Sequence, residues 1–417
     1  LKPLQGEAIP HPQLLLPWPL RSSVHKPGRH QPFPAGRVEM GASGGKERAC
    51  CAARETACLS KKAARGSDAQ AKPVVVAISG AAGQIGYSLL PMIAKGEMFG
   101  PERRVVLQCL DLSLPAVKDT MRGIEMELQD GNFELLHRVV FTTDDAEAFK
   151  DADYAVLLGA FPQQEGKEKR EIMEKNSMIF RTIGHAISRH ASKDCKVLVV
   201  GHPACTNALL CSHHAPTLPK ENFFALTRLD QNRGAGLLAR RARVSVGDVR
   251  NVIVWGSHGQ TPDVEHVEVQ GQPLRQRLSK PEDVQWLKED FVQETHNRGA
   301  NIVKARKASS ALSAARAIAN HVHDLHCGGR PGEMVSMGVW SDTNPYGISP
   351  GLIFSLPVYC TGRGSLRIAG GLQISKATRS RIGDAEKELI EDRTLMLSVL
   401  EKQRSKSATA APAPAGA

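Results

Sequence analysis

Aromatic residues make up only 5% of this 417-residue chain, and no run of eighteen apolar residues occurs anywhere in it. Few aromatic rings leave little material for stacking nucleic-acid bases, so a nucleic-acid partner is not expected. Without a long apolar run, the sequence predicts no membrane-spanning helix and no membrane partner. The 41% hydrophobic and 23% charged residues are typical of a soluble globular protein, and the length suits two domains.

The nine cysteines contain no CxxC pair, so the usual spacing of a thiolate zinc site is missing and no metal is expected. Acidic residues are scarce in residues 1–72, which hold 12 Lys/Arg and 5 Asp/Glu and so supply seven of the eleven net positive charges. The modest positive charge of the remaining chain suits an enzyme that acts on acidic small molecules.

Residues 1–72 and 405–417 differ in composition from the rest of the chain. The first segment has eight prolines before position 40 and no sustained helical or strand period, which predicts a disordered or targeting extension. The second ends in alternating alanine and proline and is predicted to be a low-complexity tail. We expect a cytoplasmic location, or an organelle if residues 1–72 act as a transit peptide.

Between these ends, short apolar runs alternate with helical patterns. The alternation predicts an α/β fold, with a doubly wound parallel sheet of the Rossmann type over residues 73–225. A mixed α+β catalytic domain is expected over residues 226–404. The predicted strands are 73–79, 105–110, 155–159, 197–200, 335–340, 352–359 and 367–368, and the predicted helices are 84–94, 167–188, 231–242, 283–307 and 311–323.

A glycine-rich turn directly follows the first predicted strand and opens a helix. Glycines permit a tight turn and let the backbone approach a pyrophosphate, whose charge the helix N-terminus favours. Asp111 ends the next strand, 25 residues beyond Gly86, where its carboxylate could bind the ribose hydroxyls of NAD and repel the additional phosphate of NADP. The turn therefore predicts an NAD site. Its residues are Gly80, Ala81, Ala82, Gly83, Gln84, Ile85 and Gly86.

Asp230, Arg233 and His258 are the candidate chemical groups. An imidazole with an ordinary pKa of about 6.5 can exchange a proton with a hydroxyl or carbonyl oxygen near neutral pH. A carboxylate that holds the second ring nitrogen fixes the tautomer and favours the protonated form. Asp230 and Arg233 are three residues apart, so they share a face of a helix. The arginine could then hold a substrate carboxylate while the aspartate holds the histidine.

Five sequence blocks carry a resemblance over about residues 73–400. They are GAAGQIGYSLL at Gly80–Leu90, MELQD at Met126–Asp130, PKENFFALTRLDQNR at Pro219–Arg233, VIVWGSH at Val252–His258 and SSALSAARAIANHVHD at Ser309–Asp324. With these blocks the chain resembles the NAD-dependent malate dehydrogenases of the cytosolic type. The resemblance implies a homodimer that interconverts malate and oxaloacetate, with His258 as proton acceptor, Asp230 as its partner and Arg233 as a ligand of the substrate carboxylate. It also implies that residues 80–86, Asp111, Asn176, Val200, Gly201 and His202 line the cofactor.

The chain departs from the family pattern at three positions near the expected site. Gln163 stands where the family has a loop arginine that would polarise the substrate carbonyl, and Lys169 replaces a later arginine, a second carboxylate ligand. His202 replaces an asparagine that contacts cofactor and substrate. Glutamine carries no charge and lysine lacks the bidentate fork of arginine, so each loop change would cost roughly ten- to a hundredfold in kcat/KM.

Three hypotheses follow from the pattern and its departures. The chain is an NAD-dependent malate dehydrogenase, weakened by the loop substitutions. Alternatively, it is a paralogue that binds NAD and dimerises without useful chemistry. In the third hypothesis it is a dehydrogenase for another 2-oxo acid, since loss of carboxylate ligands favours a monocarboxylate or aromatic substrate.

Overall fold

The computed structural model describes residues 72–161, 167–260 and 262–409. The predicted extension therefore lies outside the described residues except for Lys72, and Gln163 lies outside them too. The predicted tail begins at residue 405, but the last helix, α12 (Lys376–Thr409), continues five residues into it. Just before residue 405, the side chains of Lys402 and Gln403 form hydrogen bonds with Glu174 and Ser177 of an earlier helix. These bonds stabilise the end of α12.

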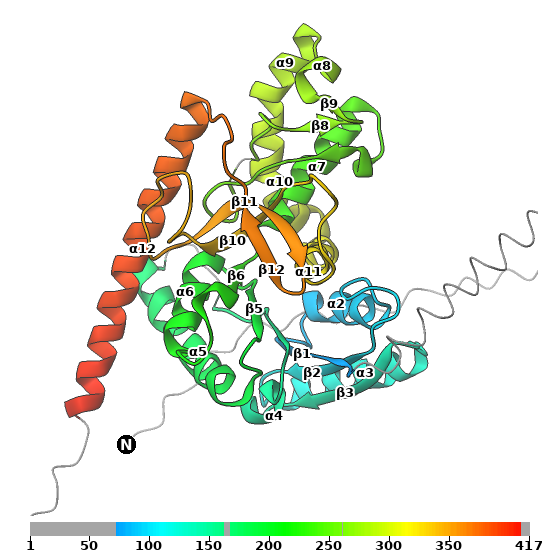
Figure 1. The fold of residues 1–417 in the computed structure, drawn as a ribbon. Helices are drawn as coiled ribbons and strands as arrows, with labels where there is room; N and C mark the ends of the chain where they lie inside the picture. The colour runs from blue at the N-terminus through cyan, green and yellow to red at the C-terminus, as the bar shows by residue number, and fades with distance from the viewer. Residues whose placement is uncertain (1–71, 162–166, 261, 410–417) are drawn as a thin grey trace, which may run out of the picture. The chain divides into compact units, whose positions relative to one another are not determined.

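Six parallel strands form the first part of a nine-stranded sheet (Figure 1). β1 and β2 are buried at every position, as expected for strands covered by helices on both faces. The order β3-β2-β1-β4-β5-β6 reverses between β1 and β4, and ligands of open parallel sheets bind at the carboxyl ends of strands beside such a reversal. The six strands are β1 (Val74–Ser79), β2 (Val105–Leu110), β3 (Leu136–Thr142), β4 (Tyr154–Leu157), β5 (Lys196–Val199) and β6 (Phe223–Ala225).

Helices connect these strands in the manner predicted for a Rossmann sheet. The expected helix at residues 84–94 is confirmed with the same bounds, and the strand at 105–110 likewise. β3, β6 and three of the helices in this part were not predicted from the sequence. The helices of this part are α2 (Gln84–Ala94), α3 (Pro115–Asp130), α4 (Asp145–Phe149), α5 (Lys169–His190) and α6 (Ala204–His214).

The strands after residue 330, which the sequence analysis places in the second domain, extend the same sheet. β10 pairs antiparallel with β6 through Gly338 and Ala225. A side chain at Gly338 would place its Cβ 2.7 Å from the Cβ of Ala225, so only glycine permits this approach. The added strands are β10 (Val335–Trp340), β11 (Ile353–Gly362) and β12 (Ser365–Ile368).

The helices of the second part surround a smaller apolar core. A separate three-stranded sheet, β7 (Val249–Arg250), β8 (Glu268–Val269) and β9 (Gln272–Pro273), lies against this core. The helices that contribute to this core are α7 (Arg228–Ala242), α8 (Leu274–Arg277), α9 (Pro281–Lys288) and α10 (Asp290–Arg306), whereas α11 (Ala311–Cys327) packs into the main core. Two single-turn 3-10 helices, Lys220–Asn222 and Val246–Asp248, complete the regular structure of the described residues.

The single helix predicted at residues 283–307 is wrong, because α9 ends and α10 begins on either side of Glu289. Trp286 and Phe291 both pack into the smaller core, with ring centroids 5.5 Å apart. Residues five positions apart lie roughly 140° apart around a straight helix, so one helix could not turn both rings to the same core. The backbone of Glu289, with φ −114° and ψ −73°, provides the bend.

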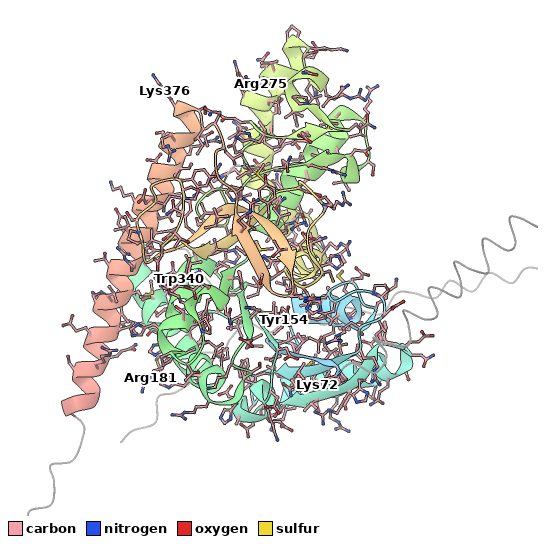
Figure 2. The ribbon with its side chains drawn as sticks, viewed as in Figure 1. Lys72, Tyr154, Arg181, Arg275, Trp340 and Lys376 are labelled. Carbon is pink, nitrogen blue, oxygen red and sulfur yellow. The ribbon has the colours of Figure 1, made fainter. Side chains whose placement is uncertain are left out.

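The long helix α12 packs beside α5 and α6 (Figures 1 and 2). It begins at Lys376, labelled in Figure 2, and runs past the helix that carries Arg181. Of the helices in the described ranges, none combines the length and apolar character needed to cross a bilayer.

Candidate active site

Asp230 and His258 form a close pair at the start of α7. The His258 Nδ1 atom lies 2.6 Å from the Asp230 Oδ2 atom, and the side chain of Asp230 is only 5% exposed. The backbone N–H of Gly259 also donates to Asp230 Oδ2, at 3.2 Å. Because Nδ1 faces the carboxylate, the Nε2 atom of His258 remains for proton exchange with a ligand.

The backbone before His258 is fixed to the main sheet. Gly256 and Ser355 of β11 exchange two backbone hydrogen bonds, of 3.2 and 2.7 Å. Gly256 has φ +90°, and a Cβ at this position would lie 2.5 Å from the Cβ of Ala385. Glycine therefore permits the turn that carries the chain from the buried segment 252–255 to the imidazole.

Arg233 lies one helical turn after Asp230 and belongs to the same site. Its Nη1 atom is 3.5 Å from Asp230 Oδ1, and its Nη2 atom donates to Ser310 Oγ at 3.2 Å. The Nε atom of Arg233 is buried and has no partner among the described residues. Burial lowers the pKa of Arg233, an effect that the nearby Arg298 strengthens and Asp230 opposes. Asp230 offsets only part of the positive charge of this buried guanidinium, so the group suits an anionic ligand.

The sequence analysis did not assign the two residues that position this guanidinium. Ser310 lies inside the quoted block 309–324, but the block alone gave it no role. Gly299 of α10 leaves space beside the guanidinium, since a Cβ there would lie 3.8 Å from Arg233 Nη2. Both contacts join segments far apart in sequence, so no local signal could have revealed them.

His202 stands directly beside the catalytic candidate His258. The two imidazole ring centroids are 4.2 Å apart, with an interplanar angle of 65°. His202 is exposed as a residue, but desolvation by the surrounding protein and the charge of the neighbouring His258 lower its pKa to about 4. His202 is therefore neutral near pH 7 and adds a hydrogen-bonding group, without a charge, next to His258.

The glycine turn lies at the carboxyl end of β1, at the reversal of strand order. Gly80 has φ +74°, and a Cβ at Gly86 would lie 2.2 Å from the carbonyl oxygen of Ala81. Asp111, at the end of β2, accepts the backbone N–H of Ala82 at 2.8 Å and that of Leu112 at 2.8 Å. The turn is therefore a backbone cradle with no room for added side chains, beside a carboxylate with further lone pairs. This arrangement fits the pyrophosphate and ribose of a dinucleotide.

The carboxyl end of β5 lies on the other side of the strand-order reversal from the glycine turn. The backbone N–H groups of Val200 and Gly201 both donate to the carbonyl oxygen of Leu157, at 2.9 and 3.2 Å. A Cβ at Gly201 would lie 2.5 Å from the Cβ of Ala160, so the two backbones pack directly against each other. This close packing fixes the backbone at the carboxyl end of β5 against the segment that follows β4.

Asn176, which the resemblance places along the cofactor, forms two hydrogen bonds with the backbone of Phe161. Its side chain is buried, accepts the backbone N–H of Phe161 at 2.7 Å and donates to the carbonyl oxygen of Phe161 at 3.3 Å. Asn176 therefore fixes the backbone just before residue 162, because a buried amide needs such partners.

Lys169, the expected second ligand of a substrate carboxylate, forms an ion pair with the last helix in this structure. Its Nζ atom forms an ion pair of 2.5 Å with Oδ1 of Asp392 on α12. The structure thus brings Asp230, Arg233, His202 and His258 together, whereas Lys169 is compensated by an acidic residue that the sequence analysis did not select. In the described parts of the chain, no group of three or more His, Cys, Asp or Glu side chains gathers as a metal site would require.

The fold is that of a dinucleotide-dependent oxidoreductase, and its candidate site holds a histidine–aspartate pair and a largely buried arginine. Comparison with known proteins gives the same class. Residues 74–224 match the lactate/malate dehydrogenase NAD binding domain, and residues 227–399 match the lactate/malate dehydrogenase alpha/beta C-terminal domain. The chain belongs to the lactate/malate dehydrogenase family.

Individual relatives support the assignment along their whole length. The chain is 45% identical over 336 residues to a Zea mays protein named cytoplasmic malate dehydrogenase, covering 79% of this chain and 99% of the relative. A crystal structure of malate dehydrogenase from Naegleria fowleri superposes with a TM-score of 0.73 at 39% identity, covering 79% and 99% of the two chains. A Trichomonas vaginalis lactate dehydrogenase in complex with NADH and oxamate gives a TM-score of 0.72 at 34% identity, covering 79% and 99%.

Proposed function

We propose that this chain is an NAD-dependent malate dehydrogenase that oxidises (S)-malate to oxaloacetate reversibly. The observation that carries the proposal is the 2.6 Å pair of Asp230 and His258, with Arg233 one turn away on α7. The resemblance of the whole described chain to malate dehydrogenases supports the choice of substrate.

In malate oxidation, Nε2 of His258 takes the proton of the C2 hydroxyl. Asp230 holds Nδ1 and stabilises the imidazolium that forms, since their charges are opposite and nearly buried. Arg233 binds a substrate carboxylate and so sets the orientation of C2 relative to His258. His202, being neutral, leaves the imidazolium without a competing positive charge and can hydrogen-bond the ligand. Bound NAD would accept the hydride from C2.

NAD would be held between the glycine turn after β1 and the segment that follows β5. We assign residues 80–86 to the pyrophosphate and Asp111 to the ribose hydroxyls, with Val200, Gly201 and His202 on the opposite side. Asn176 acts indirectly, through the backbone of Phe161. In this division, residues 73–225 supply the NAD-binding part and residues 226–404 supply the catalytic groups, although one sheet runs through both.

We also propose a homodimer located in the cytoplasm. A hollow of about 500 Å³ on α2, α3 and α11 has apolar walls, and the exposed Tyr87 and Leu312 line it. Large apolar groups exposed together mark an association surface, and a second copy of the chain is the occupant we propose. The cytoplasmic location follows the names of the curated relatives.

The test is a steady-state assay of oxaloacetate reduction by NADH with the purified full chain. Turnover well above that of a His258→Ala variant supports the proposal, and turnover no higher than that variant would refute it. A panel of other 2-oxo acids belongs in the same assay, because the Lys169–Asp392 ion pair favours the alternative of another 2-oxo acid substrate.

A further inference from the structure

Lys169 is the first residue of α5, and its charge is compensated at close range. The Nζ atom lies 2.5 Å from Oδ1 of Asp392, whose side chain is 6% exposed whereas that of Lys169 is 52% exposed. Burial by itself lowers the pKa of Lys169, but the hydrogen bond and charge of Asp392, together with Glu388 and Glu391, reverse the effect and raise it. The ammonium is therefore charged and faces three acidic residues of α12.

This ion pair lies beside the candidate active site. The second oxygen of Asp392 accepts the hydroxyl of Thr206 at 2.8 Å, and Thr206 lies one helical turn after His202. The preceding residue, Cys205, has its sulfur 3.8 Å from the carbonyl oxygen of Gly256, two residues before His258. The chain of contacts thus connects Lys169 with both imidazoles through the first turn of α6.

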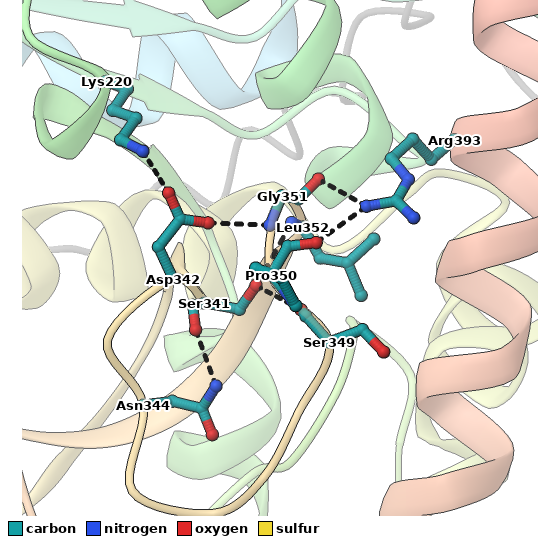
Figure 3. Close-up of polar contacts among 9 residues, drawn as sticks. All are labelled: Lys220, Ser341, Asp342, Asn344, Ser349, Pro350, Gly351, Leu352 and Arg393. Carbon is teal, nitrogen blue, oxygen red and sulfur yellow. Dashed lines mark hydrogen bonds and ion pairs between the residues drawn. The ribbon is translucent and has the colours of Figure 1, made fainter.

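The position of Asp392 is fixed by its own helix. Figure 3 shows the next residue, Arg393, donating to the carbonyl oxygens of Pro350 and Gly351 at 2.7 and 3.3 Å. On the other side, α12 is joined to α5 by a hydrogen bond of 3.0 Å from Arg170 to Ser398. The backbone of α12 around Asp392 is therefore held by contacts on both sides of the helix.

A substrate carboxylate that approaches Lys169 meets an ammonium whose charge is already paired. Asp392 repels the approaching carboxylate and so offsets much of the attraction of the lysine, and Glu388 and Glu391 add repulsion. Arg233, by contrast, is compensated only by the longer 3.5 Å contact with Asp230. Of these two cations, Arg233 is thus the more available to a carboxylate.

We propose that Asp392 is a specificity-determining residue that neutralises Lys169 and so reduces the preference for a substrate with a second carboxylate. The inference rests on the proposed function as a 2-hydroxy acid dehydrogenase. Asp392 acts through Lys169, so it is a positioning residue rather than a catalytic one. The enzyme then discriminates weakly between oxaloacetate, with two carboxylates, and pyruvate, with one.

The experiment compares kcat and KM for oxaloacetate and pyruvate in the full chain and its Asp392→Asn variant. The variant frees the ammonium, so we expect KM for oxaloacetate to fall about tenfold while KM for pyruvate and both kcat values change little. In a Lys169→Met background, Asp392→Asn should give no such gain. An unchanged or lower oxaloacetate-to-pyruvate ratio of kcat/KM in Asp392→Asn overturns the proposal, and so does an equal gain in the Lys169→Met background.

Two exposed residues of α12 provide variants that do not threaten folding. Glu388→Gln removes an acidic neighbour of Lys169 and should raise the same ratio about twofold, whereas Glu401→Gln, farther along α12, should leave it unchanged. Asp392→Glu keeps the negative charge, so the oxaloacetate-to-pyruvate ratio of kcat/KM should stay at the value of the original chain. Equal effects of Glu388→Gln and Glu401→Gln would contradict the electrostatic argument even if Asp392→Asn fails to fold.

Calorimetry separates failure of this inference from failure of the proposed function. The probes are the dicarboxylate tartronate and the monocarboxylate oxamate, added to the chain with NADH. We expect Asp392→Asn to bind tartronate about tenfold more tightly and oxamate equally well. If the original chain reduces neither 2-oxo acid, the proposed function fails. Unchanged tartronate affinity in the variant overturns the role of Asp392.

Discussion

Replacing Asp230 by asparagine tests the central pair of the site. The amide keeps the size of the carboxylate and can still accept the N–H of Gly259, but it cannot offset the charge of a protonated His258. A hydrogen bond to a charged group contributes about 1.5–3 kcal/mol. The attraction between unit charges about 4 Å apart is about 4 kcal/mol at an effective dielectric constant of about 20. The two estimates count part of the same interaction and are not added, so we take about 3–4 kcal/mol for the loss.

That loss corresponds to a decrease of about two to three orders of magnitude in kcat/KM, at about 1.4 kcal/mol for each factor of ten. Steady-state reduction of oxaloacetate measures it, and calorimetric NADH affinity should stay within about twofold because Asp230 is not part of the glycine turn. Asp324→Asn is the matched control. It removes a carboxylate that lies 2.6 Å from Arg228, which is on the same helix as Asp230, but this carboxylate does not pair with His258. A decrease smaller than about tenfold in Asp230→Asn, or an equal decrease in Asp324→Asn, would refute the reasoning.

Three further predictions concern other parts of the structure. Arg233→Lys loses the planar fork and the contact with Ser310, so KM for oxaloacetate should rise about ten- to a hundredfold in the steady-state assay, and an unchanged KM would count against Arg233 as the carboxylate ligand. Gly86→Ala places a Cβ 2.2 Å from the Ala81 oxygen and should weaken NADH binding by at least about tenfold in calorimetry, whereas Gly123→Ala, with no atom within 4 Å, should not. Burial and Arg228 lower the pKa of His321 to about 3 from 6.5, so its stabilising effect is complete above pH 6.5 and declines as the pH falls towards 3. Urea unfolding should then show a loss of about 2 kcal/mol from this residue between about pH 6.5 and pH 5, which a His321→Leu variant would not show.

Local patterns sufficed for much of the fold and for the core of the site. The strands at 105–110 and 335–340 were predicted with their observed bounds because their apolar residues form short uninterrupted runs. Asp230 and Arg233 were predictable as a pair because helical spacing alone puts them on one face. The resemblance implied that His258 pairs with Asp230, and the structure places His258 Nδ1 2.6 Å from Asp230 Oδ2. This closeness depends on the contact between Gly256 and β11.

The contacts that the sequence could not reveal join distant segments. No spacing near Asn176 or Lys169 reveals that the first bonds the backbone of Phe161 and that the second meets Asp392 of the last helix. The bend at Glu289 depends on a core that Trp286 and Phe291 share with other elements. The join of β10 to β6 depends on the fit of Gly338 against Ala225, which neither segment shows by itself.

The pairing of β10 with β6 has a consequence for dividing the molecule. A fragment that stops at residue 225 would leave β6 with an open row of N–H and C=O groups, and a fragment that starts at residue 226 would do the same to β10. Exposed strand edges template association with other chains. Each half expressed by itself should therefore aggregate, whereas the two halves produced together should recombine along that edge.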